Sequence, residues 1–305
     1  MSRLDPAWKG GYGWSLSSDR LWNDCKRAFF YRYVVNWQSS TEYPPADKIR
    51  RLKSLTGLRL LEGRLVHETI ENAIQQHRLG REIKIEPMLF FYEGRMHVFS
   101  ESPAETVTEA FNGLKIRQDF LDFVLEDGKR QLETFGRIVW PQLGDLEYLE
   151  HEEFENFYVD DLKVHVKVDY VTRSGDGTIV VTDWKTGQEY IPEKDDIQLA
   201  VYGLWASSKY EVPLERVKLE LAYLRTGRSI PVELSTDIVR EVKEAVLASS
   251  AEVLAADFLE DFPTAPDPEK CISCPFATIC PDGAETLQEL RVQEMLDAAE
   301  GPSAG

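Results

Sequence analysis

The four cysteines of this chain constrain its fold more than any other feature. Cys271, Cys274 and Cys280 form a C-x2-C-x5-C segment near the C-terminus, and Cys25 stands alone far upstream. Three thiols within ten residues are unusual for packing alone, because small apolar residues fill space without the risk of oxidation. Iron–sulfur clusters and zinc ions take four soft ligands. The pattern therefore predicts that the two ends of the chain meet and that a metal centre holds them together.

Composition indicates an ordinary globular protein. The chain has 305 residues, of which 43% are hydrophobic and 29% charged, enough for one large core or one domain with an insertion. No apolar run approaches the roughly 20 residues of a membrane helix, and Met1–Asp5 lacks the apolar region of a secretory signal. We expect a cytoplasmic protein with no membrane partner, in which cysteines favour metal binding over disulfides.

The net charge of −18, from 35 basic and 53 acidic residues, disfavours a nucleic-acid partner when taken alone. A local basic groove is still compatible with this total, and Lys48–Lys53 (KIRRLK) is locally basic. Carboxylates that surround divalent metals also add negative charge, which the ions neutralise.

Hydrophobic periodicity divides the chain into a helical first half and a mixed second half. Helices are predicted at 15–38, 58–79 (ending at Gly80), 195–210 and 236–259. Strands are predicted at 150–159, 162–171, 178–185, 217–224 and 229–234. We expect a polar loop at 39–57, hairpin turns at 174–177 and 225–228, and a peripheral helix after Asp282.

Two neighbouring strands carry carboxylates and a lysine. Asp169 lies on the first strand, and Asp183 and Lys185 lie two residues apart on the second, so they face the same side. A hairpin through Gly175–Gly177 would bring Asp169 near Asp183. Two such carboxylates form a hard site for Mg²⁺ or Mn²⁺, and the lysine supplies a cation for a phosphate oxygen or a reacting water. By itself Asp-x-Lys is weak evidence, because surface ion pairs produce the same pattern.

Two helices add polar pairs at a spacing of four residues. His67 and Glu71 share one face of a helix, and Gln198 and Tyr202 share a face of another. A lone histidine on an amphipathic helix is more often structural than a ligand, and the glutamine and tyrosine could simply cap and pack their helix. The case for function depends on the combination.

The combination resembles the RecB-like branch of the PD-(D/E)XK nucleases, with all motifs in the family's order. The motifs are G-x-x-x-H-x-x-x-E (Gly63, His67, Glu71), V-D-Y-V (Asp169), D-W-K-T-G (Asp183, Lys185, Gly187) and Q-x-x-x-Y (Gln198, Tyr202). The cysteines resemble the iron–sulfur subset, which includes the AddB nuclease domain and the CRISPR-associated exonucleases with four cysteines. The resemblance covers roughly residues 20–280, and segment 81–145 carries none of it.

The resemblance implies a fold and roles for these residues. The fold is α/β: a restriction-endonuclease-like mixed central sheet flanked by helices, with a mostly helical insertion and a metal-cluster clasp that joins the N- and C-terminal segments. The implied metal ligands are His67, Asp169, Asp183 and the carbonyl of Trp184. The implied catalytic group is Lys185, with Asp169, Asp183, Gln198 and Tyr202 around it. Glu71 would only orient its neighbours. The family often has glycine where this chain has Lys167.

A [4Fe-4S] cluster is the cofactor that the resemblance implies for Cys25, Cys271, Cys274 and Cys280. Zinc is the alternative, although structural zinc usually draws on two paired C-x2-C knuckles. The divalent ion at the other site is Mg²⁺ or Mn²⁺, and an imidazole ligand favours Mn²⁺.

The expected function is that of a metal-dependent DNA nuclease, an exonuclease, acting in repair, recombination, CRISPR adaptation or phage DNA processing. Its partners would be DNA (single-stranded or duplex ends) and a helicase or integrase. One alternative is a catalytically inactive DNA-binding or scaffold subunit of a helicase–nuclease or integration complex, and another is a zinc-stabilised adaptor.

The expected organisation has five parts. They are the N-terminal helical part with the first cysteine and the His motif (1–80), the insertion (81–145), the catalytic core (146–260), the cysteine segment (261–283) and the tail (284–305).

Overall fold

The computed structural model describes residues 3–38, 43, 46–143, 146–189 and 197–300. The expected helix at 15–38 is interrupted. Helix α1 (Ala7–Gly10) precedes α2 (Leu16–Asp24), and α3 (Lys26–Phe29) continues into a π-helical turn. Between α2 and α3, Cys25 has an extended backbone with φ −161°, and the N–H of Arg27 donates to Pro263 O at 3.0 Å. The break therefore occurs where this segment meets the C-terminal part of the chain.

The prediction of a loop at 39–57 is wrong for its second half, which forms α4 (Ala46–Ser54). Ile49 and Leu52 lie three residues apart and are buried in the core of the N-terminal part. The surrounding lysines and arginines concealed this short amphipathic pattern. Residues 39–42 and 44–45 of the expected loop lie outside the described residues.

Five described strands form a mixed sheet in the order β1-β4-β5-β6-β7, which confirms the expected fold class. Their bounds are β1 Glu147–Glu150, β4 Tyr170–Arg173, β5 Ile179–Lys185, β6 Val217–Tyr223 and β7 Arg228–Val232. β5 and β6 run parallel, joined through α11 (Ile197–Lys209), and the other neighbours are antiparallel. Residues 195–196 of the helix expected at 195–210 lie outside the described part.

The predicted strand at 162–171 is two strands. β3 (Leu162–Lys167) pairs with β2 (Phe154–Val159) in a separate two-stranded ribbon, and β4 joins the central sheet. The chain leaves one sheet for the other at Val168 and Asp169, where the N–H of Glu152 donates to Val168 O at 2.8 Å. Side-chain alternation continues across this junction, so the sequence period does not reveal it.

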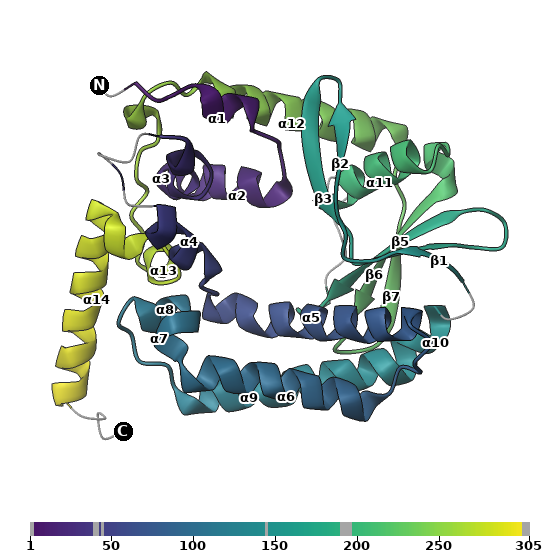
Figure 1. Ribbon diagram of the computed structural model, residues 1–305, viewed down its shortest axis with the longest axis horizontal. Coiled ribbons are helices and arrows are strands. Elements are labelled where there is room, and N and C mark those ends of the chain that lie inside the picture. Colours follow the sequence, from purple (N-terminus) through teal and green to yellow (C-terminus); the bar gives the residue numbers. More distant parts are fainter. Residues whose placement is uncertain (1–2, 39–42, 44–45, 144–145, 190–196, 301–305) are drawn as a thin grey trace.

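Helices cover both faces of the central sheet (Figure 1). On one face α11, which carries the buried Trp205, and α12 (Thr236–Ala255) pack with Val181 and Leu219 of the sheet. On the other face lie α5 (Leu58–Arg78), α6 (Ile85–Glu101), α9 (Gln118–Thr134) and α10 (Trp140–Leu143), together with the short α7 (Pro103–Thr106) and α8 (Thr108–Phe111). Segment 81–145 is thus mostly helical in its described part, as expected. None of the described helices has the length and apolar character needed to cross a membrane.

The two ends of the chain meet in a third apolar cluster. Phe262 and Phe276 pack there against the N-terminal helices, with the rings of Trp22 and Phe262 5.6 Å apart. Beyond them lie α13 (Pro268–Ile272) and α14 (Pro281–Glu300), beside the N-terminal helices in Figure 1. The prediction that the ends meet is confirmed, and apolar packing helps to join them.

Candidate functional site

The hairpin of β4 and β5 brings Asp169 beside the end of β5. Tyr170 pairs with Thr182, so the residue before β4 lies next to Asp183 and Trp184. One oxygen of Asp169, Oδ2, accepts a hydrogen bond of 2.7 Å from the backbone N–H of Trp184. Both aspartates are buried. The hairpin that the Asp-Gly turn predicted therefore places two buried carboxylates together.

His67, on α5, lies beside Asp169. Its Nδ1 lies 3.2 Å from Asp169 Oδ1, the oxygen that the Trp184 N–H does not use. The helix passes close to the end of β5 at Gly63, where an added Cβ would lie 2.9 Å from Thr186 Oγ1. The glycine of the G-x-x-x-H pattern thus permits the approach that brings the imidazole to the sheet.

Lys185 and Asp183 face the same side of β5, as the spacing predicted. Lys185 Nζ lies 2.5 Å from Asp183 Oδ2. Gln198 on α11 spans the pair, since its Nε2 is 3.3 Å from Asp183 Oδ1 and its Oε1 is 3.5 Å from Lys185 Nζ. Gln198 also donates to Tyr202 Oη at 2.9 Å, and Tyr202 donates to Lys167 O at 2.8 Å. A single chain of polar contacts therefore connects α11 to both sheets.

The buried charges shift one another's pKa values. Burial opposes the charged form of His67, but Asp169 and Glu152 outweigh it and raise the pKa of His67 well above its usual value. Burial also opposes the carboxylate of Asp169, but His67 and the Trp184 N–H hold its pKa below the usual range. Burial, and after it the charge of Asp169, raises the pKa of Asp183 to about 6. This excess of carboxylate favours a bound cation.

Glu152 belongs to this site, and the sequence analysis missed it. Its Oε1 lies 3.5 Å from His67 Nδ1, and its Oε2 lies 2.5 Å from Lys167 Nζ. His67, Glu152 and Asp169 each offer a ligand atom, and these atoms lie within 4.8 Å of one another, a grouping that does not include Asp183. Glu152 has φ 51° in the connection between β1 and β2, so no strand or helix period marks it. The acidic run of residues 150–155 was the one available signal.

Glu71 lines the same groove as His67, Glu152 and Asp169. Burial, and after it the charge of Glu152, raises the pKa of Glu71. Its carboxylate is outside the group of ligand atoms around His67. Its position is that of a neighbour of the site.

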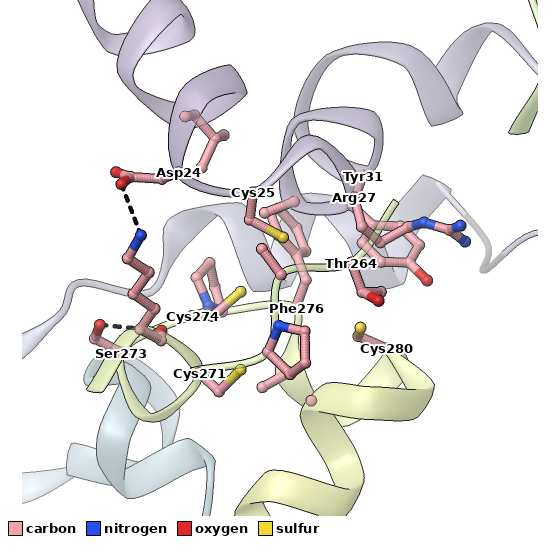
Figure 2. Close-up of a pocket in the computed structure, with 18 of the residues that line it drawn as sticks. Asp24, Cys25, Arg27, Tyr31, Thr264, Cys271, Ser273, Cys274, Phe276 and Cys280 are labelled. Carbon is pink, nitrogen blue, oxygen red and sulfur yellow. Dashed lines mark hydrogen bonds and ion pairs between the residues drawn. The ribbon is translucent and has the colours of Figure 1, made fainter. Parts of the chain in front are cut away.

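The four cysteines line one cavity of about 330 Å³ at the meeting point of the chain ends (Figure 2). Cys25 comes from the N-terminal helices, and Cys271, Cys274 and Cys280 come from the C-terminal segment. Contacts of the cavity wall tie the same segments, including an ion pair of 3.2 Å between Lys270 and Asp24. All four cysteines are free of disulfide bonds.

Burial, and after it the neighbouring thiols of Cys25, Cys271 and Cys280, raises the pKa of Cys274 to about 12, although the Phe276 N–H acts in the opposite direction. A thiol in such surroundings loses its proton only with a cation beside it. No three of these sulfur atoms lie within 4.8 Å of one another in the described part of the chain. They are therefore spread more widely than the sulfurs around a tetrahedral zinc ion.

A mixed sheet that carries buried carboxylates and a lysine at the end of one hairpin, with helices on both faces, defines a protein of the restriction-endonuclease-like class. The family model described as "PD-(D/E)XK nuclease superfamily" matches residues 13–281. The chain belongs to the PD-(D/E)XK nuclease superfamily.

Two solved structures are remotely similar. One is described as a putative exonuclease from Eubacterium rectale, at 12% sequence identity and a TM-score of 0.41, with 79% of this chain and 80% of that chain covered. The other is named SSO0001, at 16% identity and a TM-score of 0.28, with 73% of this chain and 96% of that chain covered. No curated protein matches this chain.

Proposed function

We propose that this member of the PD-(D/E)XK superfamily is a metal-dependent deoxyribonuclease of the RecB-like, iron–sulfur type, and that it acts as an exonuclease. The observation that carries the proposal is the convergence of His67 from α5, Asp169 from the start of β4, and Asp183 and Lys185 from β5. Buried carboxylates without enough positive charge beside them are costly to a fold, and their retention is explained by a bound cation.

The residues fit a divalent ion. His67, Asp169 and Asp183 are the proposed ligands, with the carbonyl of Trp184, and Glu152 is added here because its buried Oε1 has no hydrogen-bond partner among the described residues. One imidazole with several carboxylates is a donor set suited to Mn²⁺ as well as Mg²⁺. When bound, such an ion supplies charge stabilisation at the phosphate and lowers the pKa of a coordinated water.

The chain's own groups would complete the reaction. Lys185 would place its ammonium beside the reacting phosphate and water, where positive charge lowers the barrier. Gln198 would hold the side chains of Lys185 and Asp183 in position through its amide group. Tyr202 would in turn fix Gln198 through the hydrogen bond between them. These are positioning roles for α11, and they explain why polar side chains lie on its otherwise buried face.

The cysteine cavity is the proposed site of a [4Fe-4S] cluster with Cys25, Cys271, Cys274 and Cys280 as ligands. Zinc with Zn–S bonds of about 2.3 Å would require sulfurs about 3.8 Å apart. The wider spread of the thiols favours the larger cofactor. The cluster would be architectural, adding to the apolar packing that joins the two chain ends.

The proposal is tested with DNA labelled at one end and incubated with Mn²⁺ and the purified protein. An exonuclease degrades linear single strands or duplex ends and leaves circular single-stranded DNA intact. Cleavage of the circles at the same rate would contradict the exonuclease assignment, and no cleavage of either substrate would contradict nuclease activity.

The alternative is a catalytically inactive DNA-binding or scaffold subunit of a helicase–nuclease or integration complex. The net charge of −18 favours the scaffold form, because this charge disfavours contact with nucleic acid. This alternative predicts no digestion in the same assay.

A further inference from the structure

The two-stranded ribbon of β2 and β3 exposes aromatic side chains that have no role in the core. Phe154 is 70% exposed and Tyr158 is 62% exposed, although both lie on a regular strand. Their ribbon extends away from the central sheet (Figure 1). A large exposed aromatic pair on a strand is unfavourable unless something covers it.

The opposite face of the same ribbon is apolar and buried. Phe157, Val159, Val164 and Val166 are buried and belong to the apolar cluster that includes α11. Side chains on a strand alternate between faces, so Phe154 and Tyr158 point away from that cluster. The exposure is therefore confined to one face of the ribbon.

Basic residues stand directly across the strand from the two aromatic rings. Phe154 pairs with Lys167, and Tyr158 pairs with Lys163 in the antiparallel register. His165 lies between these lysines, with its ring 5.2 Å from the ring of Phe154. This face combines two aromatic rings with two lysines in a chain whose net charge is −18. An acidic protein that concentrates cations beside exposed rings has a surface complementary to a polyanion with aromatic bases.

The basic and aromatic face leads directly into the candidate site. Lys167, at the end of β3, lies 2.5 Å from Glu152, which in turn faces His67. The following residues, Val168 and Asp169, carry the chain from the ribbon into the site. A strand of nucleic acid that lies along the ribbon toward Lys167 would therefore lead toward Glu152 and Asp169.

We propose that the face formed by Phe154, Tyr158, Lys163 and Lys167 binds single-stranded DNA and guides it to the catalytic carboxylates. The inference rests on the proposed nuclease function and adds the form of the substrate. Rings four residues apart on a strand are about 13 Å apart, so they stack on separate bases of one strand. Bases within a duplex are already stacked and paired, so they do not offer their faces to these rings.

The edge of β3 opposite β2 is closed, which leaves the face itself as the binding surface. Trp14 N donates to Lys163 O at 2.9 Å, and His165 N donates to Trp14 O at 2.7 Å. At Gly13 an added Cβ would lie 2.4 Å from His165 Nε2, so the N-terminal segment presses against the imidazole. The N-terminal segment therefore pairs with this edge and contacts the His165 imidazole, while Phe154 and Tyr158 stay exposed.

The test is the binding of a fluorescent oligothymidylate, measured by anisotropy in EDTA so that no cleavage occurs. Phe154→Ala and Tyr158→Ala should each raise the dissociation constant about 5- to 150-fold, the range for loss of one base–aromatic stack. Phe90→Ala is the matched control, since Phe90 is 80% exposed on α6, which lies on the opposite side of the structure from β2 (Figure 1). Lys163→Gln should reduce the slope of log K against log salt by about 0.7.

An abasic oligonucleotide of the same length separates stacking from other effects, because it keeps the phosphates and lacks the bases on which the aromatic rings would stack. The proposal expects the aromatic variants and the wild type to bind this probe equally. Unchanged binding of oligothymidylate by both aromatic variants, an equal loss in Phe90→Ala, or an equal loss with the abasic probe would overturn it. Failure of the nuclease assignment appears separately, as wild-type protein that binds the oligonucleotide and does not cleave it with Mn²⁺.

Discussion

The backbone N–H of Trp184 donates a hydrogen bond of 2.7 Å to Asp169 Oδ2. This contact ties the carboxylate that precedes β4 to the end of β5 and leaves the other oxygen, Oδ1, facing His67 at 3.2 Å. Asp169 thus connects the hairpin to α5. Because one oxygen is fixed by the backbone, the second is held in a defined position, as the proposed role of Asp169 as a metal ligand requires.

Glu152→Gln tests whether Glu152 takes part in metal binding. The change keeps the shape of the side chain and removes the charge that faces His67. We expect the dissociation constant for Mn²⁺, measured by calorimetry or electron paramagnetic resonance, to rise about 10- to 100-fold, as for loss of a group that supports a metal site.

Glu211→Gln is the matched control for that measurement, because Glu211 is exposed, has a similar backbone φ of 53° and belongs to no group of potential metal ligands in the described part of the chain. It should bind Mn²⁺ as the wild type does. Equal affinities in wild type and Glu152→Gln would remove Glu152 from the metal site.

Cys25→Ser tests the cofactor at the chain ends. The wild type purified without oxygen should contain about four irons per chain with matching sulfide. The variant should lose most of the iron and its visible absorption, and it should unfold at a lower temperature because the N-terminal ligand is missing. Ser273→Ala, in the wall of the same cavity, should keep the iron. Zinc in place of iron in the wild type would exclude the cluster.

Glu62 is predicted to make stability depend on pH. It lies on α5 next to Asp127 of α9, and Arg225 Nη2 contacts both carboxylates, at 2.9 and 2.8 Å. Burial, and after it the charge of Asp127, raises the pKa of Glu62 from 4.5 to about 7. Between these values the folded state binds more protons than the unfolded state, so the free energy of unfolding falls as pH rises.

In Glu62→Gln the side chain at position 62 cannot titrate, so comparison with this variant isolates the contribution of Glu62 to the pH dependence of stability. The stability of the wild type relative to the variant, from urea unfolding, should decrease from pH 4.5 to pH 7. Glu86→Gln, at an exposed position of α6, controls for removal of a carboxylate. A relative stability that stays constant or increases over this pH range would show that the buried cluster does not titrate as described.

Local sequence patterns were sufficient to predict much of the fold and part of the site. Alternation and the Asp-Gly turn predicted the β4–β5 hairpin, and this hairpin places Asp169 beside Asp183. The spacing of two residues put Lys185 on the side of Asp183, and the structure has the same arrangement. These features depend on neighbours in the chain, so the sequence contains the needed information.

Features that depend on tertiary contacts were not predictable in the same way. The break at Cys25 occurs where a distant backbone carbonyl, that of Pro263, accepts from Arg27. The passage from β3 to β4 changes sheets while the alternation continues, and α4 is recognisable by the burial of Ile49 and Leu52. Glu152 enters the site from an irregular connection with φ 51°, a position set by its surroundings and by no local period.

The most direct test of the central claim is the rate of Mn²⁺-dependent DNA cleavage by Lys185→Met under single-turnover conditions. This change removes the ammonium beside Asp183 and keeps most of the length of the side chain. We predict a loss of at least about 100-fold relative to wild type and to Lys218→Met, an exposed lysine on β6, in protein that circular dichroism shows to be folded. Cleavage by Lys185→Met at a rate close to that of the wild type would contradict the account.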